Sequence, residues 1–169
     1  MFKAGNIANY AHCWGDISEN ESLLSYIKDG VRLPFVDIPP PFQLPNRCSN
    51  LSVSETNFIT SEVQDLLTSG AIEVCNSMPH CISPIHCVPK KGKDKYRLIT
   101  DLREVNKCLD TPKFKYEDIN TVLEVIDNED LLISIDLKNG FQHVLVHEED
   151  RNYLAFEWLN VVYRYRVLP

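Results

Sequence analysis

The sequence predicts an α+β fold, because helix-like and strand-like patterns are mixed along it without the regular strand–helix–strand order of a parallel sheet. The helical pattern is clearest over residues 54–70, where apolar side chains recur at helical spacing. The strand pattern is clearest over residues 153–158 and 161–166, where apolar and polar side chains alternate. With 169 residues and 44% hydrophobic content, the chain can bury the core of one domain, or of one domain and part of another.

Residues 1–50 are expected to form an N-terminal extension. Their first part shows little pattern, but Ser18 and Glu21 form a capping box that predicts a short helix ending at Gly30. Residues 34–45, "PFVDIPPPFQLP", contain five of the ten prolines. Proline fixes φ and removes a hydrogen-bond donor, so this segment predicts an extended strap, or simply a linker.

The middle of the chain predicts a long helix and a hairpin. The helix begins at the N-cap Ser54 and ends at Gly70, and its apolar stripe consists of Phe58, Ile59, Val63, Leu66 and Leu67. Residues 71–74 then begin an extended stretch. Residues 84–89 and 96–102 are strand-like and flank the polar turn "KKGKDK", which predicts a hairpin with a basic tip.

The last third predicts one more helix and three strands. Residues 117–126 have apolar side chains on one side, namely Ile119, Val122, Leu123 and Ile126. A strand is expected over 131–136, and a strand pair over 153–158 and 161–166 turns at Asn160. The final strand runs to the end of the sequence, so we expect the domain to continue beyond it.

The charge of the chain is acidic overall but basic at one place. The formal net charge is −7 and the pI is about 5.2, which argues against a surface that is basic throughout. The hairpin tip nevertheless gathers Lys90, Lys91, Lys93, Lys95 and Arg97, opposed only by Asp94. Lysine and arginine suit phosphate, although a solvated lysine-rich turn has the same composition.

The six cysteines are expected to be free thiols in a reducing, intracellular compartment. The sequence shows neither a secretory signal nor a long apolar stretch that would span a membrane. Zinc ligation is a minor alternative for Cys75, His80, Cys81, His86 and Cys87. Their spacing has no Cys-x2-Cys pair, so partly buried thiols and solvated histidines explain them more simply.

Asp136 is the carboxylate of greatest interest, because it ends the apolar run "LLISID". Taken alone, it can simply cap the following turn "KNG". Magnesium, however, prefers carboxylate oxygens together with substrate phosphates. A basic hairpin and a strand-end aspartate therefore fit nucleoside triphosphate chemistry, although no glycine-rich phosphate loop is present. A free-standing metal-dependent phosphotransferase would use the same residue.

Four segments of the sequence each resemble a motif of the same protein family, and they occur in the order that the family has. "SEVQDLLTSGAIEV" and "VPKKGKDKYRLITDLREVNKCL" resemble the segments that lead into and form the fingers of retroelement reverse transcriptases. "SIDLKNGFQHVLVHEEDRNYLAFEW" resembles their first palm motif, and "VVYRYRVLP" resembles the strand after it. The resemblance covers residues 51–169 and implies fingers and an incomplete palm of a right-hand polymerase. "YLAFEW" and "IKDGVRLPF" resemble retrotransposons of the DIRS type.

The resemblance implies roles for the palm residues. Asp136 would be the first palm carboxylate and bind both catalytic magnesium ions, and Leu137 would offer its backbone carbonyl to one of them. Phe141 would lie under the incoming sugar and act as a steric gate against the 2′-hydroxyl.

The resemblance also implies roles for the fingers. Lys91, rather than its neighbour Lys90, and Arg97 would hold the triphosphate and offset its charge. The template side of the fingers would be shaped by Asp101, Arg103 and Asn106.

The second palm motif of the family, a pair of adjacent aspartates after an aromatic residue, does not occur in this sequence. We therefore expect the isolated chain to have little or no polymerase activity. The complete enzyme would use Mg²⁺, an RNA or DNA template–primer and deoxynucleoside triphosphates, and no membrane. The alternative is a non-catalytic retroelement remnant that binds nucleic acid or a protein partner.

Overall fold

The computed structural model describes residues 2–46, 51–90, 96–111, 118–127 and 129–169. Its main sheet has five strands in the order β1-β3-β6-β7-β2. These are β1 (Phe42–Gln43), β2 (Ile72–Val74), β3 (Cys81–Ser83), β6 (Ala155–Trp158) and β7 (Val161–Tyr165). The β1–β3 and β3–β6 pairs are parallel, and the other two pairs are antiparallel. The predicted α+β class is confirmed.

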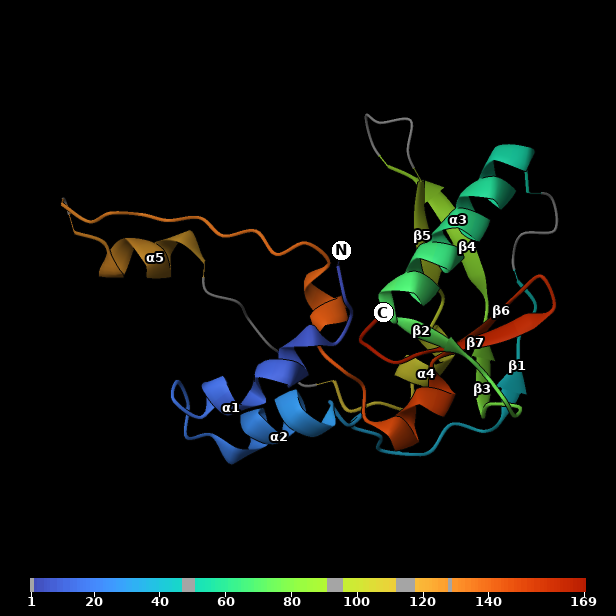
Figure 1. Ribbon diagram of the computed structural model, residues 1–169, viewed down its shortest axis with the longest axis horizontal. Helices are drawn as coiled ribbons and strands as arrows, with labels where there is room; N and C mark the ends of the chain where they lie inside the picture. The colour runs from blue at the N-terminus through green and yellow to red at the C-terminus, as the bar shows by residue number, and fades with distance from the viewer. Residues whose placement is uncertain (1, 47–50, 91–95, 112–117, 128) are drawn as a thin grey trace.

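A separate two-stranded hairpin is formed by β4 (Ile85–Pro89) and β5 (Tyr96–Thr100). The two strands are antiparallel, as the sequence predicts. Helix α3 (Val53–Ser69) runs beside this hairpin and packs on the main sheet (Figure 1). The tip of the hairpin, residues 91–95, lies outside the described residues.

Helix α3 supplies one side of the core. Its predicted stripe is confirmed, because Ile59, Val63 and Leu66 are buried and belong to the same apolar cluster as Phe156. The predicted N-cap Ser54 is wrong. The cap is Ser52, whose hydroxyl accepts a hydrogen bond from the Glu55 amide at 3.2 Å, while the Glu55 carboxylate accepts one from the Ser52 amide at 2.9 Å.

The β6–β7 hairpin closes the core. The predicted turn is confirmed, because Leu159 and Asn160 have φ values of 50° and 62°, as a tight hairpin turn requires. Tyr165 packs inside, and its hydroxyl lies 3.0 Å from the Thr100 hydroxyl of β5. This contact joins the main sheet to the hairpin, and burial raises the pKa of Tyr165 to about 12.

The N-terminal segment forms short helices, namely η1 (Asn6–Tyr10), α1 (Ala11–Trp14) and α2 (Glu21–Asp29). The predicted start of α2 at Ser18 is wrong. The Asn20 side chain caps the helix instead, because it accepts a hydrogen bond from the Leu23 amide at 3.1 Å. Gly30 ends α2 as predicted, with φ 95°.

The proline-rich strap is extended, as predicted, and is attached to the rest of the chain. Its end forms β1, and Phe35 makes an isolated bridge to Leu109. Val31, shortly before the strap, makes another to Val146. The buried Asp150 carboxylate accepts one hydrogen bond from the Leu33 amide at 2.8 Å and forms an ion pair with Arg32 at 3.0 Å. The domain boundary near residue 50 remains a prediction.

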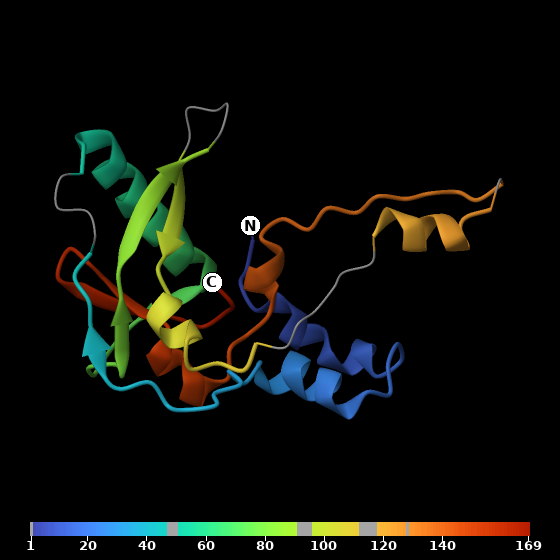
Figure 2. The same ribbon diagram turned by 180° about the vertical axis from the view of Figure 1, so that it is seen from behind.

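Three short helical turns join these parts, namely α4 (Arg103–Asn106), η2 (Gly140–His143) and η3 (Glu148–Tyr153). Helix α5 (Ile119–Val125) confirms the predicted helix over 117–126, but its apolar side chains are exposed. Figures 1 and 2 show α5 and the residues after it projecting away from the rest of the molecule. No helix within the described ranges is long and apolar enough to cross a bilayer.

Candidate nucleotide and nucleic-acid site

Asp136 lies on an extended segment, residues 129–138, which we call the arm. The predicted strand over 131–136 is wrong, because the arm joins neither sheet. Leu131, Ile133 and Ile135 are 95%, 86% and 81% exposed. A strand is stable only when a neighbouring strand takes up its backbone donors and acceptors, and within the described residues no ladder partner reaches the arm.

The base of the arm is fixed more firmly than the arm itself. Asn139 adopts the left-handed conformation with φ 54° and leads into η2. The His143 ring donates a hydrogen bond to the Lys138 carbonyl at 3.1 Å, and the Gln142 carbonyl accepts one from the Gly5 amide at 2.8 Å. Phe141 is exposed within η2. The predicted sugar gate therefore lies on an ordered turn, five residues after the exposed carboxylate.

The donors around Asp136 do not fit two magnesium ions. The neighbouring Leu137 carbonyl could add one oxygen to that of the carboxylate. Among the described residues, however, no group of three histidine, cysteine, aspartate or glutamate side chains could hold a metal ion. Asp136 thus supplies one carboxylate to a site that needs several.

The fingers residues lie on the β4–β5 hairpin, apart from the arm. Arg97 is exposed on β5, opposite Val88 on β4, and Lys90 follows the end of β4. Lys91 lies outside the described residues. The arm and the hairpin project in different directions (Figures 1 and 2), and among the ion pairs of the described residues none joins Asp136 to Arg97.

The three predicted template-side residues do lie together, after β5. Arg103 pairs with Asp101 through two parallel contacts of 2.7 Å, from Nε to Oδ1 and from Nη2 to Oδ2. This hydrogen bonding raises the pKa of Arg103, whose guanidinium stays exposed. Asn106 is also exposed, on the turn α4 that the buried Val105 anchors. The roles of these residues remain predictions.

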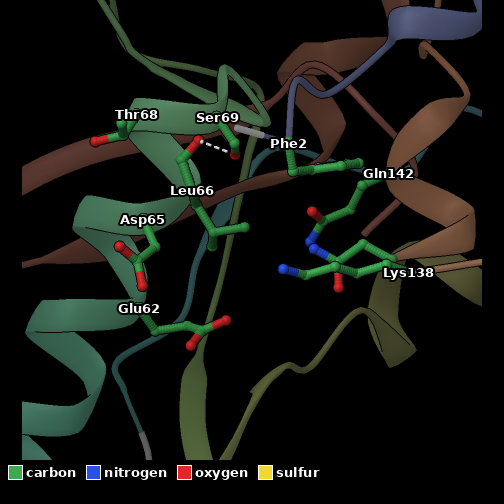
Figure 3. A pocket seen from close by; sticks show the side chains of 9 residues that line it. Phe2, Glu62, Asp65, Leu66, Thr68, Ser69, Lys138 and Gln142 are labelled. Carbon is green, nitrogen blue, oxygen red and sulfur yellow. Dashed lines mark hydrogen bonds between the residues drawn. The ribbon is translucent and has the colours of Figure 1, made fainter.

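The sequence did not reveal a pocket of ≈ 390 Å³ at the base of the arm. Glu62 and Asp65 of α3 form one wall, and Lys138 and Gln142 form the opposite wall (Figure 3). Burial, and then the charge of Asp65, raise the pKa of Glu62. Phe2 also lines the pocket. Because these residues are far apart in the sequence, no local pattern indicates that they line one pocket.

The zinc alternative gains little from the geometry. The His80 ring donates a hydrogen bond to the Pro39 carbonyl at 2.7 Å and packs on Tyr153. Burial raises the pKa of Cys81 to about 11, which disfavours the thiolate that zinc requires. None of the cysteines that the structure describes is part of a disulfide bond.

Residues 88–169 match the family described as "Reverse transcriptase (RNA-dependent DNA polymerase)". The Pol polyproteins of the Drosophila melanogaster transposons opus and 412 are both 31% identical to the chain, over 66% and 69% of its length. These regions are 11% and 10% of the two polyproteins, so the chain spans about a tenth of the relatives it matches.

A solved structure supports the same relationship. The match to the prototype foamy virus protease–reverse transcriptase covers 82% of this chain and 18% of the viral chain, with a TM-score of 0.63 and 26% identity. The DIRS-type assignment remains a prediction. The sequence matches and the fold agree, and the chain belongs to the reverse transcriptase family, in the form found in retrotransposon polyproteins.

Proposed function

We propose that this chain is the fingers and the first part of the palm of a retrotransposon reverse transcriptase, an RNA-directed DNA polymerase. The observation that carries the proposal is the fold likeness to the foamy virus protease–reverse transcriptase, which extends over 82% of the chain with 26% identity. A second structure of that viral enzyme is described in complex with double-stranded DNA, at 25% identity and a TM-score of 0.58. Nucleic acid is therefore the ligand that we propose for this chain.

Within this function, the exposed cations of the hairpin would contact phosphates. Arginine presents a planar fork that matches phosphate oxygens, and Arg97 stands exposed on β5. Lys90, at the end of β4, would add a second positive charge. Phe141 would contact the sugar from η2, and the Asp101–Arg103 pair would present a rigid polar edge to the template.

We further propose that the isolated chain has little or no polymerase activity. Magnesium would supply charge neutralisation at the reacting phosphate in the complete enzyme. In this chain Asp136 lies on an exposed arm, and the described residues bring no group of metal-binding side chains together. The contribution of the chain itself is therefore binding and orientation of nucleic acid and nucleotide.

Two measurements on the purified chain test these proposals separately. The first is binding of a fluorescent RNA–DNA primer–template, followed by anisotropy at several salt concentrations. We expect binding, and we expect Arg97→Gln to lower the slope of log affinity against log salt by about one. Lys28→Gln, which removes an equal charge from α2, should leave the slope unchanged. Absence of binding by the unmodified chain would contradict the assignment.

The second measurement is primer extension with Mg²⁺, an RNA template and deoxynucleoside triphosphates. We expect no templated incorporation above the background of the Asp136→Asn variant. Incorporation that Asp136→Asn abolishes would show that the proposal of inactivity is wrong, and would leave the family assignment intact.

The alternative, a non-catalytic interaction module, is favoured by one observation. The arm and α5 expose a band of large apolar side chains, which in soluble proteins marks a contact surface. The two functions differ in what they need. An interaction module that uses this surface would bind its partner equally well with Arg97→Gln and less well with Ile133→Ala, whereas nucleic-acid binding by the fingers would depend on Arg97.

A further inference from the structure

Three arginines surround one carboxylate on the face of the main sheet opposite α3. Glu73 on β2 lies opposite Arg164 on β7 in the strand register, and Arg166 follows β7. Arg151 reaches the same carboxylate from η3. The shortest contacts to Glu73 are 2.7 Å from Arg164 Nε, 3.5 Å from Arg166 Nε and 3.9 Å from Arg151 Nη1. We call these four residues the arginine cluster.

The cluster carries more positive than negative charge. Three guanidinium groups meet a single carboxylate at ion-pair distance. Glu148 acts on Arg151 from further away, and counting it still leaves one positive charge in excess. Burial, reinforced by the neighbouring arginines, lowers the pKa of Arg151, although Glu73 and Glu148 oppose this. An excess cation that is partly desolvated attracts an anion more strongly than a solvated one.

The three arginines differ in how many of their donors are used. Arg164 donates to Glu73 at 2.7 Å and to the Asn152 side chain at 2.6 Å, and Arg151 donates to the Val146 carbonyl at 3.0 Å. Arg166 is the most exposed of the three, with 40% of its side chain accessible against 24% for Arg164 and 13% for Arg151.

Arg166 also has a donor that is not satisfied. Its Nε atom is buried, and among the described residues it finds no hydrogen-bond partner, because the Glu73 oxygen at 3.5 Å is not placed to accept. A buried donor without a partner is unfavourable, and a ligand oxygen that accepted from it would remove that cost. The guanidinium group of Arg166 therefore lies beside the Glu73 carboxylate and still has a donor that the carboxylate does not take up.

We propose that the arginine cluster binds a phosphate group, through Arg166 with support from Arg164 and Arg151. Guanidinium forks match the geometry of phosphate oxygens, and Glu73 holds the forks in place without neutralising them. The phosphate could belong to a nucleic-acid backbone or be free in solution, and both have the same recognition chemistry. This site lies on β2, β7 and η3, separate from the β4–β5 hairpin. It does not depend on polymerase activity.

The first test measures thermal unfolding of the whole chain in sodium phosphate and in sodium chloride at equal ionic strength. Phosphate also stabilises proteins nonspecifically, so the informative quantity is the difference between variants. We expect the phosphate-dependent rise in Tm to be lost in Arg166→Gln and kept in the control Lys28→Gln, which removes the same charge from α2. Equal behaviour of the two variants, or no rise in the unmodified chain, would overturn the proposal.

The second test identifies the source of the phosphate with a short fluorescent single-stranded DNA. If the ligand is a nucleic-acid backbone, Arg166→Gln should weaken DNA binding about tenfold, which is the effect of one charge-assisted hydrogen bond. If the ligand is free phosphate, DNA binding should be unchanged while the Tm effect is lost. Both results support a phosphate site.

A third variant separates a phosphate site from a purely structural ion network. Glu73→Gln removes the negative charge that repels phosphate but keeps a side-chain oxygen that can accept the hydrogen bond from Arg164, so the forks stay in place. We therefore expect its phosphate-dependent rise in Tm to exceed that of the unmodified chain. A folded Glu73→Gln variant that loses the phosphate response would overturn the proposal. If that variant does not fold, the comparison of Arg166→Gln with Lys28→Gln decides alone.

Discussion

Shortening Ile133 to alanine should leave the free energy of unfolding unchanged within about 0.5 kcal/mol, the usual range for exposed positions. Ile133 lies in the middle of the arm and is 86% exposed, so its side chain gains almost no burial on folding. The same substitution at Ile59, which is 0% exposed in the core, should cost about 2–5 kcal/mol. The two variants remove the same atoms, so the contrast depends only on burial.

Urea unfolding measures this contrast directly. With a slope of about 2 kcal/mol per M, Ile59→Ala should lower the midpoint by about 1–2.5 M, and Ile133→Ala by less than about 0.3 M. Trp158 packs in the core and provides the fluorescence signal. A loss of more than about 1.5 kcal/mol in Ile133→Ala would refute the exposed arm. It would mean that the arm is packed and that Asp136 has a fixed position.

Two further predictions concern the attachment of the N-terminal segment. Gly30 has φ 95°, and a Cβ there would lie 2.7–2.8 Å from the backbone of residues 146–147, so Gly30→Ala should destabilise by at least about 2 kcal/mol in urea unfolding. The control Gly15→Ala should be neutral, because Gly15 has φ −63° and its Cβ would make only an ordinary 3.7 Å contact with the His12 carbonyl oxygen; equal effects of the two variants would refute the contact at Gly30. The hydrogen bond from Arg32 lowers the pKa of Glu149 below 4.5, so its stabilisation is complete above pH 4.5 and is lost as pH falls through the lower value of the folded state. The stability difference between the unmodified chain and Glu149→Gln should therefore close on acidification, and a difference that stays constant with pH would refute the pairing.

Local pattern was enough to predict the elements that carry their own boundary signals. The apolar stripe and Gly70 located α3, and the alternation around Asn160 located the β6–β7 hairpin. The N-cap was misplaced from Ser52 to Ser54 because both serines precede the stripe. The glutamate three residues after Ser52 completes a capping box, and that signal distinguishes the two serines.

Features that depend on distant partners could not be predicted. Residues 131–136 have the composition of a strand, but a strand also needs neighbours, and the sequence does not say whether they are present. The arginine cluster joins Glu73 to Arg164 through strand register, across 91 residues of sequence. A single sequence contains no local trace of such a register.

The exposed arm gives a second reason for the proposed inactivity: Asp136 is present, but no neighbouring surface among the described residues holds it in position. Its isoleucines and leucines favour a strand and would each gain about 1.5–3 kcal/mol from burial. A surface that pairs with the arm would therefore order the backbone and position Asp136 in the same event. We expect the carboxylate to become useful only when such a surface covers the arm. A variant such as Ile133→Ala should then weaken that ordering while leaving the stability of the rest of the chain untouched.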